Sequence, residues 1–346
     1  MDGLRAHLRE GQVIPAHPLA LTPRRTLDER RQRALTRYYV DAGAGGIAVG
    51  VHTTQFAIRE HGLYRPVLEL AAETARASLG PDRTFALVAG VCGATRQACG
   101  EAAMARSLGY RVALLNLAGL DDMDDRALVR HCRAVTEVLP LFGFYLQPAV
   151  GGRLLSRGFW RDLCELPSLW AIKIAPFDRY ATTDVVRAVL ESGRDDVALY
   201  TGNDDNIVAD LVTPVRTRVS GVVRERCMDG GLLGQWAVWT HQAVELLAAA
   251  RAARRADTVP SSLLALGSAL TAANGVIFDA ANGFAGCIPG IHEVLRAQGL
   301  MRGVWCLDPR EGLSPGQRQA ITRLRATHPE LGDDTFVHEN LDRWLS

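Results

Sequence analysis

The sequence contains a single lysine, and that lysine lies in an apolar stretch of chain. Lys and Arg together number 39, and every one of them except Lys173 is an arginine. The segment 168–174, SLWAIKI, predicts a buried strand with Lys173 near its end and with Ile172 and Ile174 on the opposite face. Burial lowers the pKa of an amine, and a neutral amine attacks carbonyl groups to form a Schiff base. Arginine cannot do this, because its guanidinium stays protonated. From position alone, a nucleophile and a salt-bridged structural lysine are equally open.

The rest of the chain alternates short apolar runs with longer helical patterns. Strands are predicted at 17–21, 46–51, 84–90, 110–116, 141–146, 168–174, 196–201 and 219–224. Helices are predicted at 28–42, 64–78, 95–108, 124–138 and 182–192, and a last one at 230–254 would close the set. Strands that are apolar throughout are typical of parallel sheets covered on both faces. Eight strand–helix units in about 250 residues predict an α/β fold, the (β/α)8 TIM barrel, whose catalytic side chains stand at the C-terminal ends of the strands.

Two parts of the chain are expected. Residues 1–255 would form the barrel, and residues 256–346, which lack a strong strand pattern, would form a helical C-terminal region packed on it. A doubly wound sheet is the main alternative. Its glycine-rich turn should lie between a strand and the following helix. Here AGAGG (42–46) follows a helix and precedes a strand, which suits a helix C-cap.

Composition excludes several classes of partner. A formal net charge of +1 gives no reason to expect nucleic acid or an anionic membrane as a partner. The longest apolar runs are too short to span a membrane. The seven cysteines show no zinc-ligand spacing, so no metal site is expected. Scattered cysteines in odd number suit reduced thiols, which predicts a cytoplasmic protein.

A second motif precedes the lysine by one predicted strand. In FYLQPAVGG (144–152) the chain resembles the dihydrodipicolinate synthase and N-acetylneuraminate lyase family of class I aldolases. That family carries a Tyr-x-x-Pro motif one barrel strand before its Schiff-base lysine. Tyr145 and Pro148 match it, and Lys173 follows Tyr145 by 28 residues, as in the family. The resemblance implies that Tyr145 relays protons to and from the substrate, a role for which a phenol must be within hydrogen-bond reach.

The loop after the second predicted strand also resembles the family. VGVHTTQFA (49–57) falls where the family binds the keto-acid carboxylate through backbone N–H groups and hydroxyls. His52 takes the place of the first hydroxyl residue and Thr53 that of the second. Either the His52 imidazole relays protons, or Tyr145 works with Thr53 or Thr54. Thr54 is also expected to contact the substrate. A structural turn histidine is the remaining reading.

Two further segments are candidates for the substrate side. YTGNDD (200–205) resembles the family's Gly-x-Asp loop, which implies that Gly202, Asn203 and Asp204 face the substrate. Arg224 and Glu225 lie at the end of the last predicted strand, where they would either face the substrate or form a structural ion pair.

The match to the synthase branch is incomplete. Val150 stands where synthases place an arginine for a second carboxylate, and LLNLAGLDD (114–122) lacks their tyrosine. We therefore expect a divergent member that is not a true dihydrodipicolinate synthase.

The expected function is that of a Schiff-base-forming lyase or aldolase. It would cleave or form a C–C bond of a pyruvate-type 2-oxo acid through an imine on Lys173, with an aldehyde as the other partner. No metal or organic cofactor is required, and the resemblance implies a homo-oligomer, a dimer or tetramer. One alternative is a hydro-lyase that dehydrates a hydroxylated sugar acid or amino-acid-derived oxo acid through the same imine. The other is a non-catalytic barrel that binds a ligand.

Overall fold

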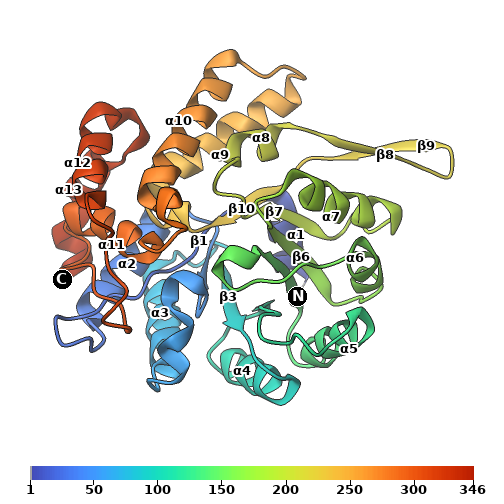
Figure 1. The fold of residues 1–346 in the computed structure, drawn as a ribbon, viewed down its shortest axis with the longest axis horizontal. Coiled ribbons are helices and arrows are strands. Elements are labelled where there is room, and N and C mark those ends of the chain that lie inside the picture. The colour runs from blue at the N-terminus through green and yellow to red at the C-terminus, as the bar shows by residue number, and fades with distance from the viewer. Residues whose placement is uncertain (1) are drawn as a thin grey trace.

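Eight parallel strands form the barrel in the computed structural model, which describes residues 2–346 (Figure 1). The strands are β1 (Val13–Pro15), β2 (Gly46–Val49), β3 (Ala86–Val91), β4 (Val112–Leu115), β5 (Leu141–Leu146), β6 (Leu169–Ala175), β7 (Ala198–Thr201) and β10 (Gly230–Leu233). They follow one another around the barrel in chain order. A parallel bridge between Ala16 and Ala48, with the N–H of His17 donating to the Ala48 carbonyl at 2.8 Å, joins the ends of β1 and β2. The predicted TIM barrel is confirmed.

Helices cover the outside of the strands. They are α2 (Glu29–Asp41), α3 (Tyr64–Ser78), α4 (Thr95–Ser107), α5 (Asp125–Thr136), α6 (Arg157–Leu163), α7 (Arg179–Glu191), α8 (Ile207–Val212) and α9 (Thr240–Arg255). Four of these helices begin at a side-chain cap that accepts a backbone N–H, from Asp28, Asp124, Ser156 and Asp178. Such caps satisfy donors that a helix start leaves unpaired, so the sequence itself fixes where these helices begin.

The barrel interior is filled at its N-terminal end. Helix α1 (Asp2–Glu10) lies across that end, with Leu8 fully buried and the Tyr200 hydroxyl donating to the Leu8 carbonyl at 2.8 Å. Phe142 packs edge-on against Tyr200 in the layer above, with ring centroids 5.1 Å apart. The interior is therefore a packed core below, and open space is left toward the C-terminal ends of the strands.

The C-terminal region is helical, as predicted. It contains α10 (Ser261–Ile277), α11 (Cys287–Ala297), α12 (Gln317–Thr327) and α13 (Asp334–Leu345), and the part of the chain that the structure describes has no strand after β10. Helix α13 packs on α2, where the Trp344 indole N–H donates to Asp41 at 2.6 Å. Figure 1 shows these helices, orange to red, along one side of the barrel. A domain boundary at residue 255 stays a prediction.

The first and last barrel strands differ from the prediction. The first is Val13–Pro15 instead of 17–21. The segment predicted at 219–224 spans β8 (Val215–Val219) and β9 (Val222–Arg226), an antiparallel hairpin that projects from the barrel (Figure 1). The eighth barrel strand is the glycine-containing GGLL of β10, taken from the start of the predicted helix 230–254. The hairpin has the stronger β-branched pattern, so propensity pointed to the wrong segment.

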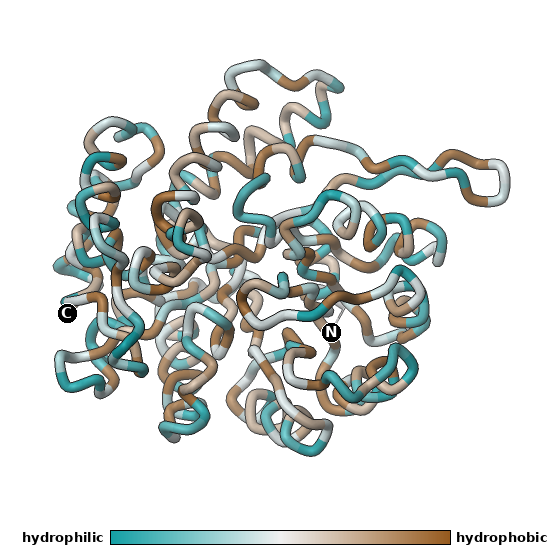
Figure 2. The backbone as a smooth tube through the Cα atoms, viewed as in Figure 1, coloured by the Kyte–Doolittle hydropathy of each residue, from teal (hydrophilic) through white to brown (hydrophobic). Residues whose placement is uncertain are grey.

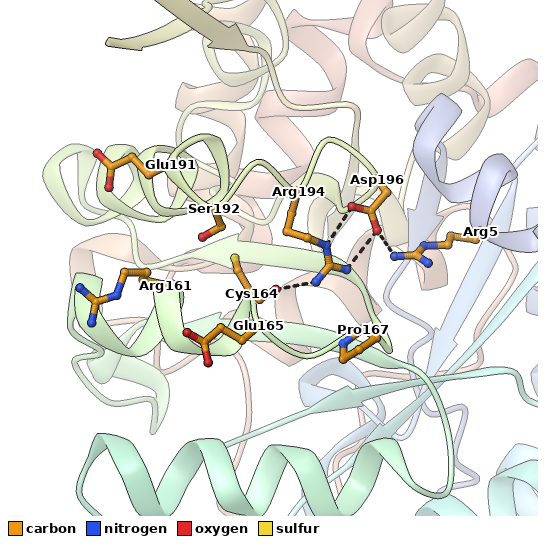
Figure 3. Close-up of a pocket in the computed structure, with 9 residues that line it drawn as sticks. All are labelled: Arg5, Arg161, Cys164, Glu165, Pro167, Glu191, Ser192, Arg194 and Asp196. Atoms are coloured by element: carbon orange, nitrogen blue, oxygen red, sulfur yellow. Dashed lines mark hydrogen bonds and ion pairs between the residues drawn. The ribbon is translucent and has the colours of Figure 1, made fainter. Parts of the chain in front are cut away.

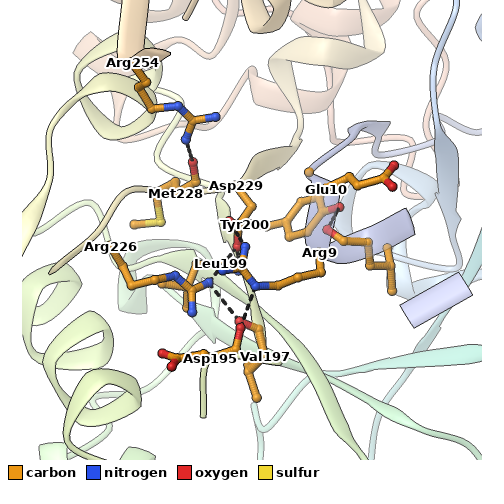
Figure 4. A network of polar contacts seen from close by, with 12 residues as sticks. Arg9, Glu10, Asp195, Val197, Leu199, Tyr200, Arg226, Met228, Asp229 and Arg254 are labelled. Carbon is orange, nitrogen blue, oxygen red and sulfur yellow. Dashed lines mark hydrogen bonds and ion pairs between the residues drawn. The ribbon is translucent and has the colours of Figure 1, made fainter. Parts of the chain in front are cut away.

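The base of this hairpin is held by a polar network (Figure 4). Arg226 donates to Asp229 at 2.8 Å and to the Val197 carbonyl at 3.0 Å, and Arg9 also pairs with Asp229. Asp229 in turn accepts the N–H of Leu199 at 2.7 Å. Farther out, Val222 and Val223 are 63% and 53% exposed, and Figure 2 shows apolar residues along this projecting arm.

No helix between residues 2 and 346 combines the length and the apolarity that a bilayer-crossing segment needs.

Candidate active site

Lys173 points into the barrel from β6. Across the neighbouring strands it pairs with Phe144 of β5 and Tyr200 of β7, and its Nζ lies 4.6 Å from the centre of the Phe144 ring. The side chain is 8% exposed. A Cβ added at Gly202 would lie 2.7 Å from Lys173 Cε, so the lysine occupies the space that a side chain at position 202 would need. Ile172 and Ile174 pack in the outer core, as the alternation of a strand requires.

A cavity of about 50 Å³ surrounds the Lys173 amine at the C-terminal ends of the strands. Its polar lining consists of His52, Thr53, Gln147, Lys173, Asp204 and Cys287. Most of its apolar lining is bulky: Val51, Phe144, Leu146, Val150, Phe177, Phe278, Phe284 and Ile291. The C-terminal helical region contributes Phe278, Phe284, Cys287 and Ile291 to the lining, so both parts of the chain build the site.

Lys173 and Asp204 have oppositely perturbed acidities. Burial lowers the pKa of Lys173 to about 8, and the negative charge of Asp204 opposes that shift. Burial raises the pKa of Asp204 to about 7, although the N–H of Gln235, 2.8 Å from its Oδ1, and the Lys173 charge favour the carboxylate. The amine is therefore neutral far more often near neutral pH than the amine of an exposed lysine. The same cavity holds a carboxyl group able to exchange a proton in that range, and such pairs are typical of catalytic sites.

His52 and Thr53 also reach the cavity, from a 3₁₀ turn (His52–Thr54) after β2. Burial, and next the charge of Lys173, lower the pKa of His52 to about 4, so its imidazole is neutral at neutral pH. The Thr53 hydroxyl donates to the Ala16 carbonyl at 2.7 Å. Its lone pairs can still accept a hydrogen bond.

Thr54 is turned away from the cavity. It is fully buried, donates to the His17 carbonyl at 2.7 Å and accepts the N–H of Gly50 at 3.0 Å. Its hydroxyl therefore ties the turn to the segment that follows β1, and its expected place in substrate binding is not supported by the geometry.

The expected placement of Tyr145 is wrong. Tyr145 lies in the outer core between β5 and the helices, with its ring 5.5 Å from that of Trp160. Its hydroxyl donates to the carbonyl of Leu155 at 3.5 Å and accepts the N–H of the same residue at 3.3 Å. Burial raises its pKa. It does not line the cavity around Lys173.

A register shift explains this error. Leu141 pairs with Leu169, but the next residue, Phe142, pairs with Ala171, so Trp170 is an extra residue in β6. A shift of one residue exchanges the two faces of a strand. As a result Lys173 stands opposite Phe144, and the tyrosine 28 residues before it points outward.

Three other expected substrate contacts lie elsewhere. The Asn203 carboxamide accepts the N–H of Phe177 at 3.0 Å and donates to Thr182 and Asp210, so it braces two loops instead of lining the cavity. Arg224 and Glu225 lie on the projecting hairpin, because the eighth barrel strand is β10. Glu225 accepts from Arg216 at 2.5 Å across that hairpin, which agrees with the ion-pair alternative for the glutamate.

Several lining residues were missed from the sequence. Phe144 and Gln147 flank the matched tyrosine, and the alternation of strand faces could have shown Phe144 once the partner of Lys173 was known. Phe284 and Cys287 lie more than one hundred residues beyond Lys173 and carry no local signal of contact with it.

A larger cavity, of about 660 Å³, lies at the N-terminal ends of β6 and β7 (Figure 3). Arg194 dominates it, and its guanidinium donates to the carbonyls of Leu166 at 2.9 Å and Leu169 at 3.1 Å and pairs with Asp196 at 2.9 Å. Arg194 and Asp196 are thus engaged in contacts that join loops, and Arg5 also pairs with Asp196. The cavity around Lys173 is smaller, but it holds the groups with perturbed pKa values, and it lies at the end of the barrel where TIM-barrel enzymes carry their active sites.

No protein-family model and no curated protein sequence matches this chain. Solved structures do match. Dihydrodipicolinate synthase from Oceanobacillus iheyensis superposes with a TM-score of 0.75 at 18% identity, over 94% of this chain and 99% of that chain. The synthase from Acinetobacter baumannii, complexed with pyruvate, gives 0.74 at 19% identity, over 91% and 98%. N-acetylneuraminate lyase from Fusobacterium nucleatum gives 0.73 at 17% identity, over 94% and 100%. This chain therefore has the fold of the dihydrodipicolinate synthases and N-acetylneuraminate lyases.

Proposed function

We propose that this protein is a Schiff-base-forming lyase or aldolase that acts on a pyruvate-type 2-oxo acid, as a divergent member of the dihydrodipicolinate synthase and N-acetylneuraminate lyase family. The observation that carries the proposal is Lys173. It is the single lysine of the chain, it stands in a cavity at the C-terminal end of the barrel, and burial lowers its pKa to about 8. The likeness to a synthase structure that contains pyruvate supports the same chemistry.

The reaction follows from a neutral buried amine. Lys173 Nζ attacks the keto carbon of the oxo acid, and the carbinolamine loses water to give a protonated imine. In the cleavage direction, the C3–C4 bond breaks as the C4 hydroxyl loses its proton. The bonding pair moves toward the imine, which leaves an enamine and an aldehyde. Protonation of the enamine at C3 and hydrolysis of the imine then release the shortened oxo acid and restore the lysine.

Proton transfer in this scheme falls to Asp204 and His52 instead of Tyr145. Asp204 has a pKa of about 7 and shares the cavity with the amine, so it can both accept and return a proton near neutral pH. The neutral His52 imidazole offers a second acceptor. Thr53 lies beside His52 and is placed to accept a hydrogen bond from the substrate.

Borohydride reduction in the presence of pyruvate tests the proposal. One reduced adduct should form, and peptide mapping should place it on Lys173 and not on the N-terminal amine. Lys173→Arg keeps the positive charge and should give no adduct, while Arg194→Lys, which adds an amine outside the site, should leave the labelled position unchanged. If wild-type protein gives no adduct with any of a panel of 2-oxo acids, the Schiff-base proposal is refuted and the alternative of a non-catalytic barrel is favoured.

A hydro-lyase would use the same imine, so trapping does not separate the two reactions. Product analysis does, because a lyase yields a shorter oxo acid and an aldehyde, whereas a dehydratase keeps all the carbon in one product. The aromatic residues around Lys173 favour the lyase, since they leave few partners for the hydroxyl groups of a sugar acid. A homo-oligomer and a cytoplasmic location are part of the proposal, and light scattering measures the first.

A further inference from the structure

The lining of the cavity around Lys173 combines few polar side chains with four phenylalanine rings, Phe144, Phe177, Phe278 and Phe284. Phe144 covers the Nζ, at 4.6 Å from the ring centre. Phe177, from the loop after β6, meets Phe284, from the C-terminal region, in an edge-to-face contact with centroids 6.1 Å apart. A Cβ at Gly234, which also lines the cavity, would lie 3.1 Å from the Phe278 ring, so that ring packs over the loop after β10.

In the described part of the chain, the lining offers no positively charged partner, apart from Lys173, to a second acidic group on the substrate. Among residues 2–346, no arginine lines the cavity, and the single cation there is Lys173. Once the protonated imine forms, its positive charge lies beside the carboxylate that the oxo acid itself carries. A carboxylate or phosphate on the distal part of a substrate would therefore be buried without a counter-charge, which is strongly unfavourable.

Hydroxyl groups on the distal part would also lack partners. Beyond Lys173, Asp204, His52 and Thr53, the side chains able to form a strong hydrogen bond reduce to the carboxamide of Gln147, which is 7% exposed. If the distal part of the substrate carried several hydroxyl groups, most of them would be left without a partner. Each unpaired hydroxyl would lower the binding affinity by about tenfold or more.

We propose that the distal part of the substrate is apolar, so that the aldehyde released from, or added to, the pyruvate unit is an aromatic aldehyde. This inference rests on the proposed Schiff-base function and names its substrate class. The single amide of Gln147 suits one polar substituent, and the rings of Phe177, Phe278 and Phe284 suit a flat hydrocarbon surface through edge and face contacts.

The aromatic pair must move to admit that aldehyde. The cavity of about 50 Å³ has room for only a few water-sized groups, which is too little for pyruvate together with an added ring. Phe177 and Phe284 both have left-handed backbones, with φ of 53° and 68°, a conformation that bulky residues rarely adopt. They stand in two loops that lead into α7 and α11. A shift of these loops would separate the two rings, whose centroids lie 6.1 Å apart, and enlarge the cavity.

The test compares aldehydes in the addition of pyruvate. Benzaldehyde, glyceraldehyde and succinic semialdehyde serve as aromatic, hydroxylated and carboxylated probes, and the kcat/KM of each is measured by product formation. Benzaldehyde should exceed the other two by about tenfold or more. Phe284→Ala should lower the ratio of benzaldehyde to glyceraldehyde by about tenfold, whereas Tyr180→Ala, at a position 85% exposed, should not change it.

A second variant tests the missing cation directly. Val150→Arg adds a guanidinium at the rim of the cavity and should raise the kcat/KM for succinic semialdehyde relative to benzaldehyde by about tenfold. Suppose that pyruvate is trapped on Lys173 but the wild type uses glyceraldehyde or succinic semialdehyde as well as benzaldehyde or better. That result overturns the inference and leaves the proposed function standing. Absence of any pyruvate adduct refutes the proposed function, and the inference with it.

Discussion

Replacing Tyr145 by phenylalanine tests whether its hydroxyl relays protons, as its motif implies, or only supports the structure, as its outward position indicates. The substitution removes a hydroxyl that makes two long hydrogen bonds to the backbone of Leu155, at 3.5 and 3.3 Å. The buried N–H of Leu155 loses its partner, which should cost about 1–2 kcal/mol of unfolding free energy. Because the hydroxyl does not reach the cavity around Lys173, the rate of proton exchange should stay within about twofold of the wild type.

The assay follows the methyl protons of pyruvate in heavy water. Imine and enamine formation exchange these protons for deuterium, and NMR records the loss of signal without any knowledge of the aldehyde. Urea unfolding measures the stability cost in parallel. Tyr110→Phe is the matched control, since it removes a buried hydroxyl that donates to the Leu68 carbonyl at 2.9 Å outside the cavity. A relay contributes about 10²–10⁴-fold. A loss of that size in Tyr145→Phe, with Tyr110→Phe unaffected, would refute the register described for β5 and β6.

Three more outcomes are expected. The neutral amine of Lys173 is the nucleophile, and its pKa is lowered to about 8, so the rate of pyruvate trapping should rise with pH up to about 8 and level off above it. Asp204→Asn removes the negative charge that stabilises the ammonium form. This variant should therefore show the same rise at lower pH. His52→Ala should slow deuterium exchange by roughly 10²–10⁴-fold if the imidazole transfers protons, and near-normal exchange would assign His52 to the structure of its turn. Gly202→Ala should displace the lysine, whose Cε lies 2.7 Å from the added Cβ, and slow trapping by about 10²-fold while circular dichroism shows an intact fold; trapping at the normal rate would show that the lysine has another path to the cavity.

Most of the barrel could be predicted from the sequence because its inner strands are apolar on both faces. The nearly continuous apolar runs of β3, β5 and β6 are typical of strands in a parallel sheet that is covered on both faces. The ends of the barrel were harder. Gly230 and Gly231 give β10 little strand propensity, and the strand forms because β1 and β7 flank it on both sides. Local propensity placed the strand in the hairpin instead.

The site was predictable to the extent that it depended on one residue. Lys173 stands where its type and neighbours indicated, and Gly202 and Asp204 share its cavity. The position of Tyr145 was not predictable, because the register changes at an extra residue, Trp170, and neither this residue nor its direct neighbours Leu169 and Ala171 is a glycine or proline that would indicate the shift. The aromatic side of the cavity could not be predicted either, since Phe284 meets Phe177 through contacts between segments distant in the chain.

The contribution of the C-terminal helices to the cavity sets an order of events during synthesis. The last barrel strand ends at Leu233, whereas Phe278, Phe284 and Ile291 are made later. At ribosomal rates of about 5–20 residues per second, a chain with all its strands exists for several seconds before these residues can dock. During that interval water reaches the amine of Lys173, whose proton affinity is then close to that of any exposed lysine. A nascent or C-terminally truncated chain should therefore react only slowly with cellular carbonyl compounds. The amine of Lys173 becomes a good nucleophile only when the final helices dock.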